Sequence, residues 1–262
     1  MISDTTVERK SETVENKESI NEICTILKNK KYCYLPADKV KALLAIKGSN
    51  SLNDWNDFKE SWGDLVIDQY MADGGTYRKR RHATLSALSS STDWSIEPHQ
   101  PHYQTVHYNN LNGGIARHYK PILKMIINNV FFKNIITLGC EVFARLSPSD
   151  SWHIEVHQFR INANTKQKGE PTPEGVHRDG VSFVMVLMIN RENIDSGTTC
   201  IYDLNKNKVE EFTMKTPLSM ALFDDENVFH GVTPVKPLNL SEKATRDVLV
   251  VTFKKKVTVG VY

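Results

Sequence analysis

The stretch VSFVMVLMINRENIDSGTTCIY (residues 181–202) carries the pattern that decides the fold. Two runs rich in β-branched and other apolar residues, 181–189 and 199–202, flank a cluster of Asn, Asp, Ser and Gly, which is typical of strands joined by a turn. Similar runs occur at 152–161, 209–214, 218–223, 248–253 and 257–261. Many short strands in succession predict a β-sandwich or jelly roll.

Helical spacing dominates the first half of the chain. Apolar residues recur at three and four over 20–27, 38–46 and from 119 to about 145, which predicts helices packed against a sheet. Helices followed by strands indicate an α+β protein. Because no internal repeat and no Pro-, Gly- or Ser-rich linker divides the chain, we expect one domain over 19–262, with its β core at about 150–262.

Composition excludes several classes of protein. Lys plus Arg total 33 and Asp plus Glu 31, a net charge of +2 that disfavours a nucleic-acid binder. The longest apolar run, 183–189, is far shorter than the roughly 18 residues that span a bilayer, so no membrane partner is expected. Residues 1–18 are polar and lack the apolar segment of a secretory signal, which predicts a disordered tail. The four cysteines are scattered without a C-x-x-C pair and indicate reduced thiols in a cytoplasmic protein.

The segment PTPEGVHRDG (171–180) contains a candidate metal site. His177 and Asp179 are two residues apart at the start of a predicted strand, where side chains at i and i+2 leave the same face. His230, in NVFHGVTPV (227–235), can supply a third ligand. Two histidines and a carboxylate form the facial triad of non-haem Fe(II), which leaves positions open for a co-substrate and O2. The alternative is that H-x-D occurs by chance and these side chains are structural.

Arg246 begins the apolar run RDVLVVTF (246–253). A guanidinium can bind a carboxylate through two parallel hydrogen bonds, which suits the distal carboxylate of a metal-bound 2-oxoacid. The alternative is a surface arginine that caps the strand or pairs with Asp247.

Several ordered motifs together resemble one family. PTPEGVHRDGVSFVMVLMINRENIDSGTTCIYD (171–203), LFDDENVFHGVTPV (222–235) and RDVLVVTF are similar to the Fe(II)/2-oxoglutarate-dependent dioxygenases that include bacterial free L-isoleucine and L-leucine hydroxylases. DQYMADGGTYRKRRHATL (68–85) and IEVHQFRINA (154–163) extend the resemblance to approximately residues 67–254.

The resemblance implies a double-stranded β-helix (jelly roll, cupin-like) with a helical N-terminal layer. It implies Fe(II) on His177, Asp179 and His230, and the C5 carboxylate of 2-oxoglutarate on Arg246. The implied reaction uses O2 to hydroxylate an unactivated C–H of a free aliphatic L-amino acid while 2-oxoglutarate becomes succinate and CO2. Related iron halogenases replace the carboxylate ligand by a small residue, so Asp179 favours hydroxylation. Ser196-Gly197 departs from the family, in which a Gly-Gly turn is expected.

A free amino acid brings two charges that need buried partners. Candidate cations for its carboxylate are Arg160, Arg78, Arg80 and Arg81. In an extended chain, Arg78 and Arg80 share one face and Arg81 lies on the other, so these arginines cannot all reach one pocket. A solvated basic face is the alternative. Asp93, Glu97 and Glu155 are possible acceptors for the ammonium group, and sequence does not rank them.

The segment 89–114 contains Pro98, Pro101 and a Gly pair and predicts an ordered loop or lid over the substrate. Tyr103, Tyr108 or Trp94 are candidates for its apolar walls. A second metal site made of His99, His102 and His107 is a further hypothesis. His153 and His157 share a strand face with Glu155, and we expect them to have supporting or structural roles.

Two other readings stay open. The same chemistry, as hydroxylation or desaturation, could act on a peptide- or carrier-bound residue in a natural-product pathway. A noncatalytic metal-binding β-barrel is the alternative from another class, but it gives Arg246 no role. Nucleotide-dependent chemistry has no support, because neither a P-loop nor a G-x-G-x-x-G motif is present.

Overall fold

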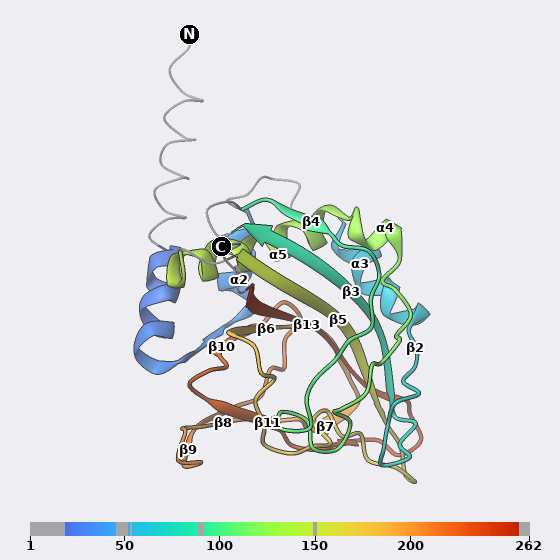
Figure 1. Cartoon of the computed structure of the whole chain (residues 1–262). Helices are drawn as coiled ribbons and strands as arrows, with labels where there is room; N and C mark the ends of the chain where they lie inside the picture. The colour runs from blue at the N-terminus through green and yellow to red at the C-terminus, as the bar shows by residue number, and fades with distance from the viewer. Residues whose placement is uncertain (1–18, 46–51, 53, 89–91, 149–150, 257–262) are drawn as a thin grey trace.

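A large antiparallel sheet forms the middle layer of the molecule (Figure 1). The structure is a computed structural model that describes residues 19–45, 52, 54–88, 92–148 and 151–256. The strand order is β1-β10-β6-β13-β5-β3-β2, with β4 paired to β3. The strands are β1 (Tyr32–Leu35), β2 (Val66–Ile67), β3 (Arg78–Leu88), β4 (Trp94–Ile96), β5 (Ser151–Ala163), β6 (Phe183–Glu192), β10 (Met220–Asp224) and β13 (Ala244–Lys256).

Two smaller sheets face one side of the large sheet. One has the order β11-β8-β9 and the other pairs β12 with β7. Their strands are β7 (Ile194–Ser196), β8 (Thr199–Tyr202), β9 (Lys208–Phe212), β11 (Phe229–Val232) and β12 (Val235–Pro237). Val184, Met188 and Val248 of the large sheet form a buried cluster with Ile201 of β8. The result is a β-rich core of facing sheets, consistent with a jelly roll.

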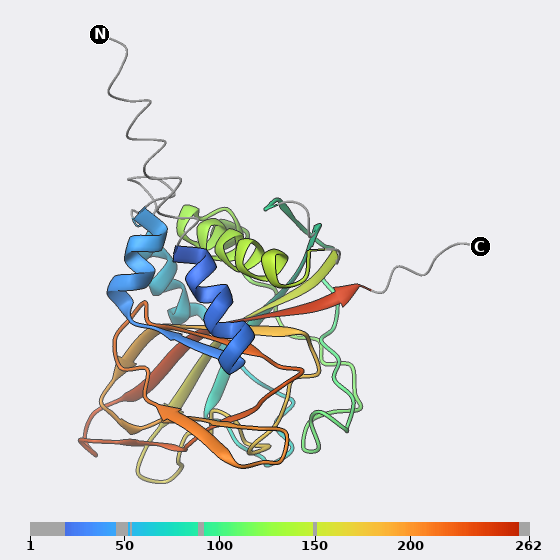
Figure 2. The ribbon, with the colours of Figure 1, turned by 90° about the vertical axis from the view of Figure 1, so that its left-hand side faces the viewer.

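Helices cover the other side of the large sheet (Figure 2). They comprise residues 19–30, α2 (Ala37–Ala45), α3 (Trp55–Glu60), the 3-10 turn η1 (Ser61–Asp64), α4 (Lys124–Ile127) and α5 (Val130–Leu146). The α5 helix contributes Phe143, which stacks on Phe183 with ring centroids 4.6 Å apart and contacts Phe253 edge-on at 4.7 Å. Burying this aromatic layer anchors the helices to the sheet and leaves the opposite face free to line a site.

The expected strands are largely present. Six of the seven predicted runs correspond to β5, β6, β8, β9, β10 and β13, and the seventh, 257–261, lies outside the described residues. The expected tail, 1–18, also lies outside them. The region from 119 to 145 contains α4 and α5, the first helical residue being Lys124.

The prediction of a mainly helical first half was wrong in one respect. The strands β1 to β4 all join the large sheet, so the sheet is not confined to 150–262. The longest of them, β3, begins RKRRH, and a strand with charged residues on both faces lacks the apolar alternation that reveals a half-buried strand. It is nonetheless a long strand of the large sheet because it pairs with β5 over eleven residues.

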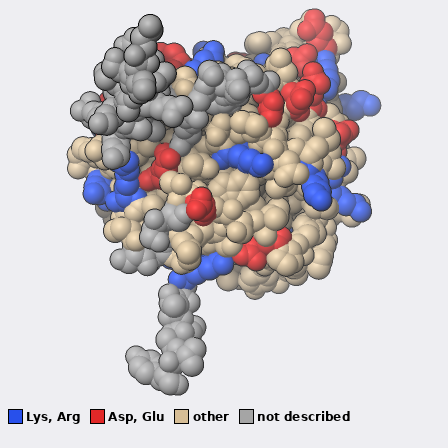
Figure 3. Space-filling view, turned by 90° about the horizontal axis from the view of Figure 1, so that it is seen from above, with Lys and Arg blue, Asp and Glu red and all other residues tan. Residues whose placement is uncertain are grey.

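Charged side chains of both signs are interspersed on the face seen from above (Figure 3). Among the described residues, no helix is long and apolar enough to cross a membrane. In the described part of the chain none of the four cysteines forms a disulfide, and three of them are buried.

Candidate metal centre and active-site cavity

A cavity of about 310 Å³ lies between the large sheet and the β11-β8-β9 sheet. Strands β3, β5, β6 and β13 supply one wall, and the segments 102–109 and 171–181 close the other sides. Because alternate residues of a strand share a face, Val248 and Val250 of β13 enter the cavity beside Phe159 of β5.

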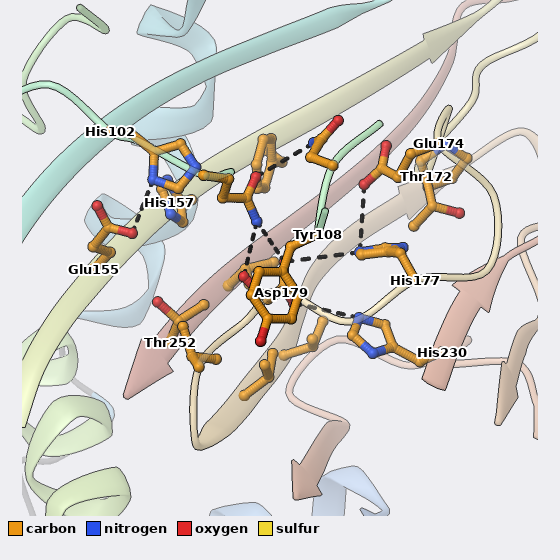
Figure 4. A pocket seen from close by; sticks show the side chains of 18 of the residues that line it. His102, Tyr108, Glu155, His157, Thr172, Glu174, His177, Asp179, His230 and Thr252 are labelled. Carbon is orange, nitrogen blue, oxygen red and sulfur yellow. Dashed lines mark hydrogen bonds and ion pairs between the residues drawn. The ribbon is translucent and has the colours of Figure 1, made fainter. Parts of the chain in front are cut away.

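His177, Asp179 and His230 meet at one end of this cavity (Figure 4). His177 and Asp179 lie on the segment before β6, and His230 lies on β11. The backbones of the two histidines exchange hydrogen bonds of 2.9 Å, which brings their rings to 4.7 Å. Asp179 has one carboxylate oxygen 3.7 Å from Nε2 of His177 and the other 3.4 Å from Nε2 of His230.

The local hydrogen bonds orient these side chains. Nδ1 of His177 lies 3.0 Å from the carbonyl oxygen of Gly175 and must donate to it, so Nε2 faces Asp179 and is the atom that a metal would take in place of its proton. The Asp225 carboxylate accepts the backbone N–H groups of Asp179, Gly180 and Val181 at 3.0, 2.9 and 3.2 Å. Burial, reinforced by the charge of Asp179, raises the pKa of Asp225 to about 6.

Gly180 is required by the turn that follows Asp179. Its φ is +78°, and a Cβ there would lie 2.4 Å from the ring of Tyr108. Tyr108 therefore packs directly over the backbone of the site.

The donor set fits a divalent metal ion. The ligand atoms of His177, Asp179 and His230 all lie within 4.8 Å of one another. Although burial opposes ionisation, hydrogen bonds from His177 and His230 hold the pKa of Asp179 well below its usual range. Two imidazoles and one ionised carboxylate leave coordination positions for a chelating co-substrate, as in non-haem Fe(II) sites.

Two further side chains approach this centre that the sequence did not single out. Glu174 has one oxygen 3.3 Å from Nε2 of His177, while its other oxygen is buried without a hydrogen-bond partner among the described residues. Gln104 donates from Nε2 to the backbone oxygen of Asp179 at 3.2 Å, and its Oε1 accepts from Arg117 at 2.9 Å. A side chain from the expected lid thus contacts a candidate ligand. Gln104 and Asp179 are far apart in the sequence, so no local pattern predicted this contact.

Arg246 lies in the cavity wall with only 3% of its surface exposed. Its Nε has no hydrogen-bond partner among the described residues. Burial and the charge of Arg191 lower the pKa of Arg246 to about 10, so the guanidinium is charged at neutral pH. The alternative of a pair with Asp247 is not found, because adjacent strand residues face opposite ways and Asp247 binds Arg160.

The turn expected to depart from the family lies beside Arg246. Ser196 and Gly197 both have positive φ, +63° and +70°. A Cβ on Gly197 would lie 2.8 Å from Val235 and 3.6 Å from Cδ of Arg246, so the glycine permits close packing at this point.

The four candidate substrate arginines are divided by strand alternation. Arg78 and Arg80 line the cavity, whereas Arg81, between Arg80 and His82, donates to the backbone oxygens of Asp64 and Pro121 instead. Arg160 points away from the cavity and makes two hydrogen bonds with Asp247, at 2.7 and 2.6 Å. The structure therefore does not bring Arg81 and Arg160 to the cavity.

The predicted histidine trio of the lid is not assembled. His99 bonds to the backbone oxygen of Tyr119 at 2.8 Å, and His107 packs on Tyr108. His102 instead joins His82, Glu155 and His157 in a second group whose potential ligand atoms lie within 4.8 Å of one another. We call these four residues the histidine–glutamate cluster.

Of the candidate ammonium acceptors, Glu155 lines the cavity, and Asp93 and Glu97 do not. Tyr103 and Tyr108 line it as expected, together with His153, whereas Trp94 packs against Phe132 of α5. Arg117, which the sequence did not single out, also lines the cavity and is 1% exposed.

Comparison with known proteins agrees with this arrangement. A family model described as 2OG-Fe dioxygenase matches residues 59–252. The 3(1)-hydroxy-L-isoleucine 4-dioxygenase of Pantoea ananatis is 25% identical over 240 residues, covering 89% of this chain and 96% of that protein. The L-isoleucine-4-hydroxylase of Bacillus thuringiensis is 26% identical over 199 residues, covering 73% of this chain and 82% of that protein.

A solved structure is also similar. The crystal structure of a bsmA homologue from Methylobium petroleophilum has a TM-score of 0.79 and 32% sequence identity, and the match covers 90% of this chain and 92% of that one. Since the family model spans most of the sequence, this chain belongs to the 2OG-Fe dioxygenase family, whose enzymes use Fe(II), 2-oxoglutarate and O2.

Proposed function

We propose that this enzyme hydroxylates an unactivated C–H bond of a free aliphatic L-amino acid resembling isoleucine or leucine. One observation carries the proposal: the candidate metal centre and the buried guanidinium groups of Arg78 and Arg80 line the same cavity. A metal centre alone suits many substrates, whereas buried cations in the same cavity favour a small substrate with a carboxylate. The isoleucine-related activities named for the two sequence relatives support the same substrate class.

In this proposal His177, Asp179 and His230 hold Fe(II), and Arg246 binds the C5 carboxylate of 2-oxoglutarate. When bound, Fe(II) and 2-oxoglutarate supply the O2 chemistry that oxidises the substrate and release succinate and CO2. The protein excludes water and positions one C–H bond at the metal. The cavity has an apolar wall suited to an aliphatic side chain, formed by Val184, Val186, Val248 and Val250.

The size of the cavity supports a free rather than a tethered substrate. Its volume of about 310 Å³ is at the lower end of ligand sites, which commonly span roughly 300–1,000 Å³. Tyr103, Gln104 and Tyr108 of the lid segment close one side. The four cysteines, none of which forms a disulfide in the described residues, fit a reducing compartment, and we place the enzyme in the cytoplasm.

Anaerobic visible spectroscopy tests this function. Fe(II) and then 2-oxoglutarate are added to the purified protein, followed by a panel of free L-amino acids. We expect a metal-to-ligand charge-transfer band with 2-oxoglutarate and a shift of that band with one aliphatic amino acid. A band that no free amino acid shifts would instead favour a peptide- or carrier-bound residue, and the absence of any band would contradict the enzymatic proposal.

A further inference from the structure

We infer that the histidine–glutamate cluster and the neighbouring Arg80 and Arg117 form a recognition site for the α-amino-acid headgroup. Glu155 accepts the substrate ammonium group, and Arg80 with Arg117 binds its carboxylate. This inference rests on the proposed function and deepens it, because it makes a free ammonium and a free carboxylate both requirements of the substrate.

The first argument is an excess of buried positive charge. Arg78, Arg80 and Arg117 are 5%, 3% and 1% exposed. In the described part of the chain, the carboxylate within ion-pair distance of them is that of Asp68, 2.8 Å from Arg78 and 3.7 Å from Arg80. Arg78 and Arg80 thus share one carboxylate, and Arg117 has none within ion-pair distance in the described residues. A buried charge without a partner is costly, so a carboxylate ligand at this place would be strongly favoured.

The unused donors identify where that carboxylate would bind. Nε of Arg80 and Nε of Arg117 are both buried without a hydrogen-bond partner in the described residues. Arg117 uses another nitrogen to donate to Gln104 at 2.9 Å. Both residues line the cavity, and a guanidinium with an unpaired N–H group is suited to a carboxylate.

Arg80 is held rigidly for this role. Its guanidinium carbon lies 3.7 Å from the ring centroid of Tyr119 and 4.3 Å from that of Phe159. Its Nη2 donates to Nδ1 of His157 at 2.7 Å. A cation fixed on both faces loses little freedom when an anion binds, which lowers the entropic cost of recognition.

Glu155 supplies the opposite charge next to these cations. Its Oε2 accepts from Nδ1 of His102 at 2.8 Å, and its Oε1 lies 3.4 Å from Nε2 of His82. Although burial opposes ionisation, the hydrogen bonds from the surrounding histidines hold the pKa of Glu155 well below its usual range. An ionised carboxylate that lines the cavity is the acceptor that a buried ammonium group needs.

The two charges lie on either side of the same pair of rings. His82 and His157 are opposite each other in the β3–β5 register and stack with centroids 4.8 Å apart. Arg80 contacts this pair at His157, and Glu155 approaches it at His82. A positive and a negative group that both line the cavity are the complement of a zwitterion.

Figure 4 shows where this headgroup site lies relative to the metal centre. His102, Glu155 and His157 are on one side of Asp179, and Glu174, His177 and His230 are on the other. Gln104 connects the two regions, since it contacts Arg117 through its oxygen and Asp179 through its nitrogen. A headgroup held on the first side would direct the aliphatic side chain toward the metal.

A second metal ion is the competing occupant of the cluster, and the geometry disfavours it. A metal needs the lone pair of each imidazole, but the lone pair on Nδ1 of His157 accepts from Arg80. The Arg80 charge would also repel a divalent cation. Furthermore, His82 has no exposed surface and does not line the cavity.

Calorimetry on the Fe(II)- and 2-oxoglutarate-loaded protein, kept free of O2, tests the inference as binding rather than turnover. The ligands are the preferred amino acid, its 2-hydroxy acid analogue, which lacks the ammonium, and its amide, which lacks the carboxylate. For the wild type we expect both analogues to bind at least about tenfold more weakly. This comparison needs no variant, and equal affinity for all three ligands would overturn the inference.

Two variants test which residue binds each charged group of the amino acid. Glu155→Gln should weaken the amino acid at least about tenfold and leave the 2-hydroxy acid nearly unchanged. Arg80→Met should weaken the amino acid and remove its advantage over the amide. Glu192→Gln, exposed at the end of β6, and Arg81→Met, on the other face of β3, are the matched controls and should bind as the wild type does.

Three results would contradict the assignment. An equal loss for both ligands in Glu155→Gln would indicate a structural role only. Weaker 2-oxoglutarate binding in place of weaker amino-acid binding in Arg80→Met would assign Arg80 to the co-substrate. A second equivalent of bound metal that disappears in Glu155→Gln would make the cluster a metal site. If the wild type bound no amino acid at all, the proposed function itself would fail, which is a different outcome from any of these.

Discussion

Asp225 supports the candidate metal centre without being one of its ligands. It accepts three consecutive backbone N–H groups, from Asp179 to Val181, and so fixes the direction in which the Asp179 side chain leaves the chain. Its own Oδ1 lies 3.8 Å from Nδ1 of His230. Groups that orient metal ligands in this way commonly contribute about 10- to 100-fold to metal affinity.

Replacement of Asp225 should therefore weaken the metal site. Asp225→Asn offers one carbonyl oxygen in place of two and places an amide next to backbone donors, so we expect Fe(II) affinity to fall about 10- to 100-fold. An anaerobic Fe(II) titration measures this. Asp224→Asn is the matched control, because Asp224 bonds to Asn227 instead. Wild-type affinity in Asp225→Asn would refute the supporting role.

Arg246 has a single role in the proposed function. Since a charge-assisted bidentate contact contributes roughly 1.5–3 kcal/mol or more, Arg246→Ala should raise the KM for 2-oxoglutarate about 10- to 100-fold. Fe(II) affinity should stay unchanged, because the residue contacts none of the candidate ligands. Steady-state kinetics with varied 2-oxoglutarate measures the effect. An unchanged KM would remove the assigned role.

His82 makes the stability of the protein depend on pH. Burial lowers its pKa from 6.5 to about 4, so between these values the unfolded chain binds a proton that the folded chain does not. Stability therefore falls as pH drops from about 6.5 toward 4, by about 3 kcal/mol in all if each pKa unit contributes about 1.4 kcal/mol.

Urea unfolding between pH 7.5 and 4.5 tests this dependence. The His82→Gln variant should lose less stability than the wild type over this range, because its side chain does not titrate. It should retain part of the slope, since burial also lowers the pKa of His157 well below its usual range. His118→Gln, at an exposed position, is the control. Parallel pH profiles for wild type and His82→Gln would contradict the explanation.

At the scale of elements, β3 and β5 decide which polar groups enter the cavity. Their antiparallel register places Arg80 opposite Phe159 and His82 opposite His157, so one shared face carries cations, imidazoles and a carboxylate. This polar face is buried between the sheets, whereas the helices cover the other face of the large sheet.

The contact between α5 and the large sheet is close-packed at Gly139. A Cβ at this position would lie 2.8 Å from Cζ of Phe253, which is fully buried. Gly139→Val should therefore destabilise the fold by about 1–3 kcal/mol through overpacking. Lys133→Val, on the exposed side of α5, controls for the helix propensity of valine.

Thermal unfolding measures both variants. We expect a lower Tm for Gly139→Val than for Lys133→Val, and 2-oxoglutarate binding at low temperature should be unchanged because the helix lies on the far side of the sheet. An equal Tm for the two variants would contradict close packing at this contact.

Sequence predicted the apolar strands better than it predicted the strand whose inward residues are polar. The run 181–189 is apolar and lies within the large sheet, so local composition was sufficient to identify β6. For β3, the inward residues are charged because they line a polar cavity, and the period-two signal is masked. Alternation along the chain did predict that Arg80 and Arg81 point to opposite faces.

In the candidate site, too, local patterns predicted neighbouring residues but not long-range contacts. His177 and Asp179 are close in sequence, and their proximity could be predicted. His230 and Arg246 were candidates from their residue types and positions, and the resemblance implied the same roles for them. Contacts such as Arg160 with Asp247, or His102 with Glu155, join residues on different segments. They depend on strand register and loop path, which a local pattern does not specify.

At the scale of the whole molecule, the two faces of the large sheet have different roles. Helices bury the outer face in the larger apolar cluster, which also includes Trp62, Phe131 and Leu249. The inner face and the small sheets enclose the cavity, with the candidate metal centre at one end and buried arginines lining the same space. This separation lets the inner face carry charged groups while the helical side supplies the apolar burial that stabilises the fold.

The central claim is that this cavity couples 2-oxoglutarate decarboxylation to hydroxylation of a free aliphatic L-amino acid. The most direct test is turnover under 18O2 with the amino acid that shifts the charge-transfer band, followed by mass spectrometry of succinate and amino acid. We expect one hydroxylated amino acid per succinate, with the new hydroxyl oxygen derived from O2, and no product from Asp179→Ala. Succinate formed without any oxidised amino acid, across the whole panel, would contradict the account.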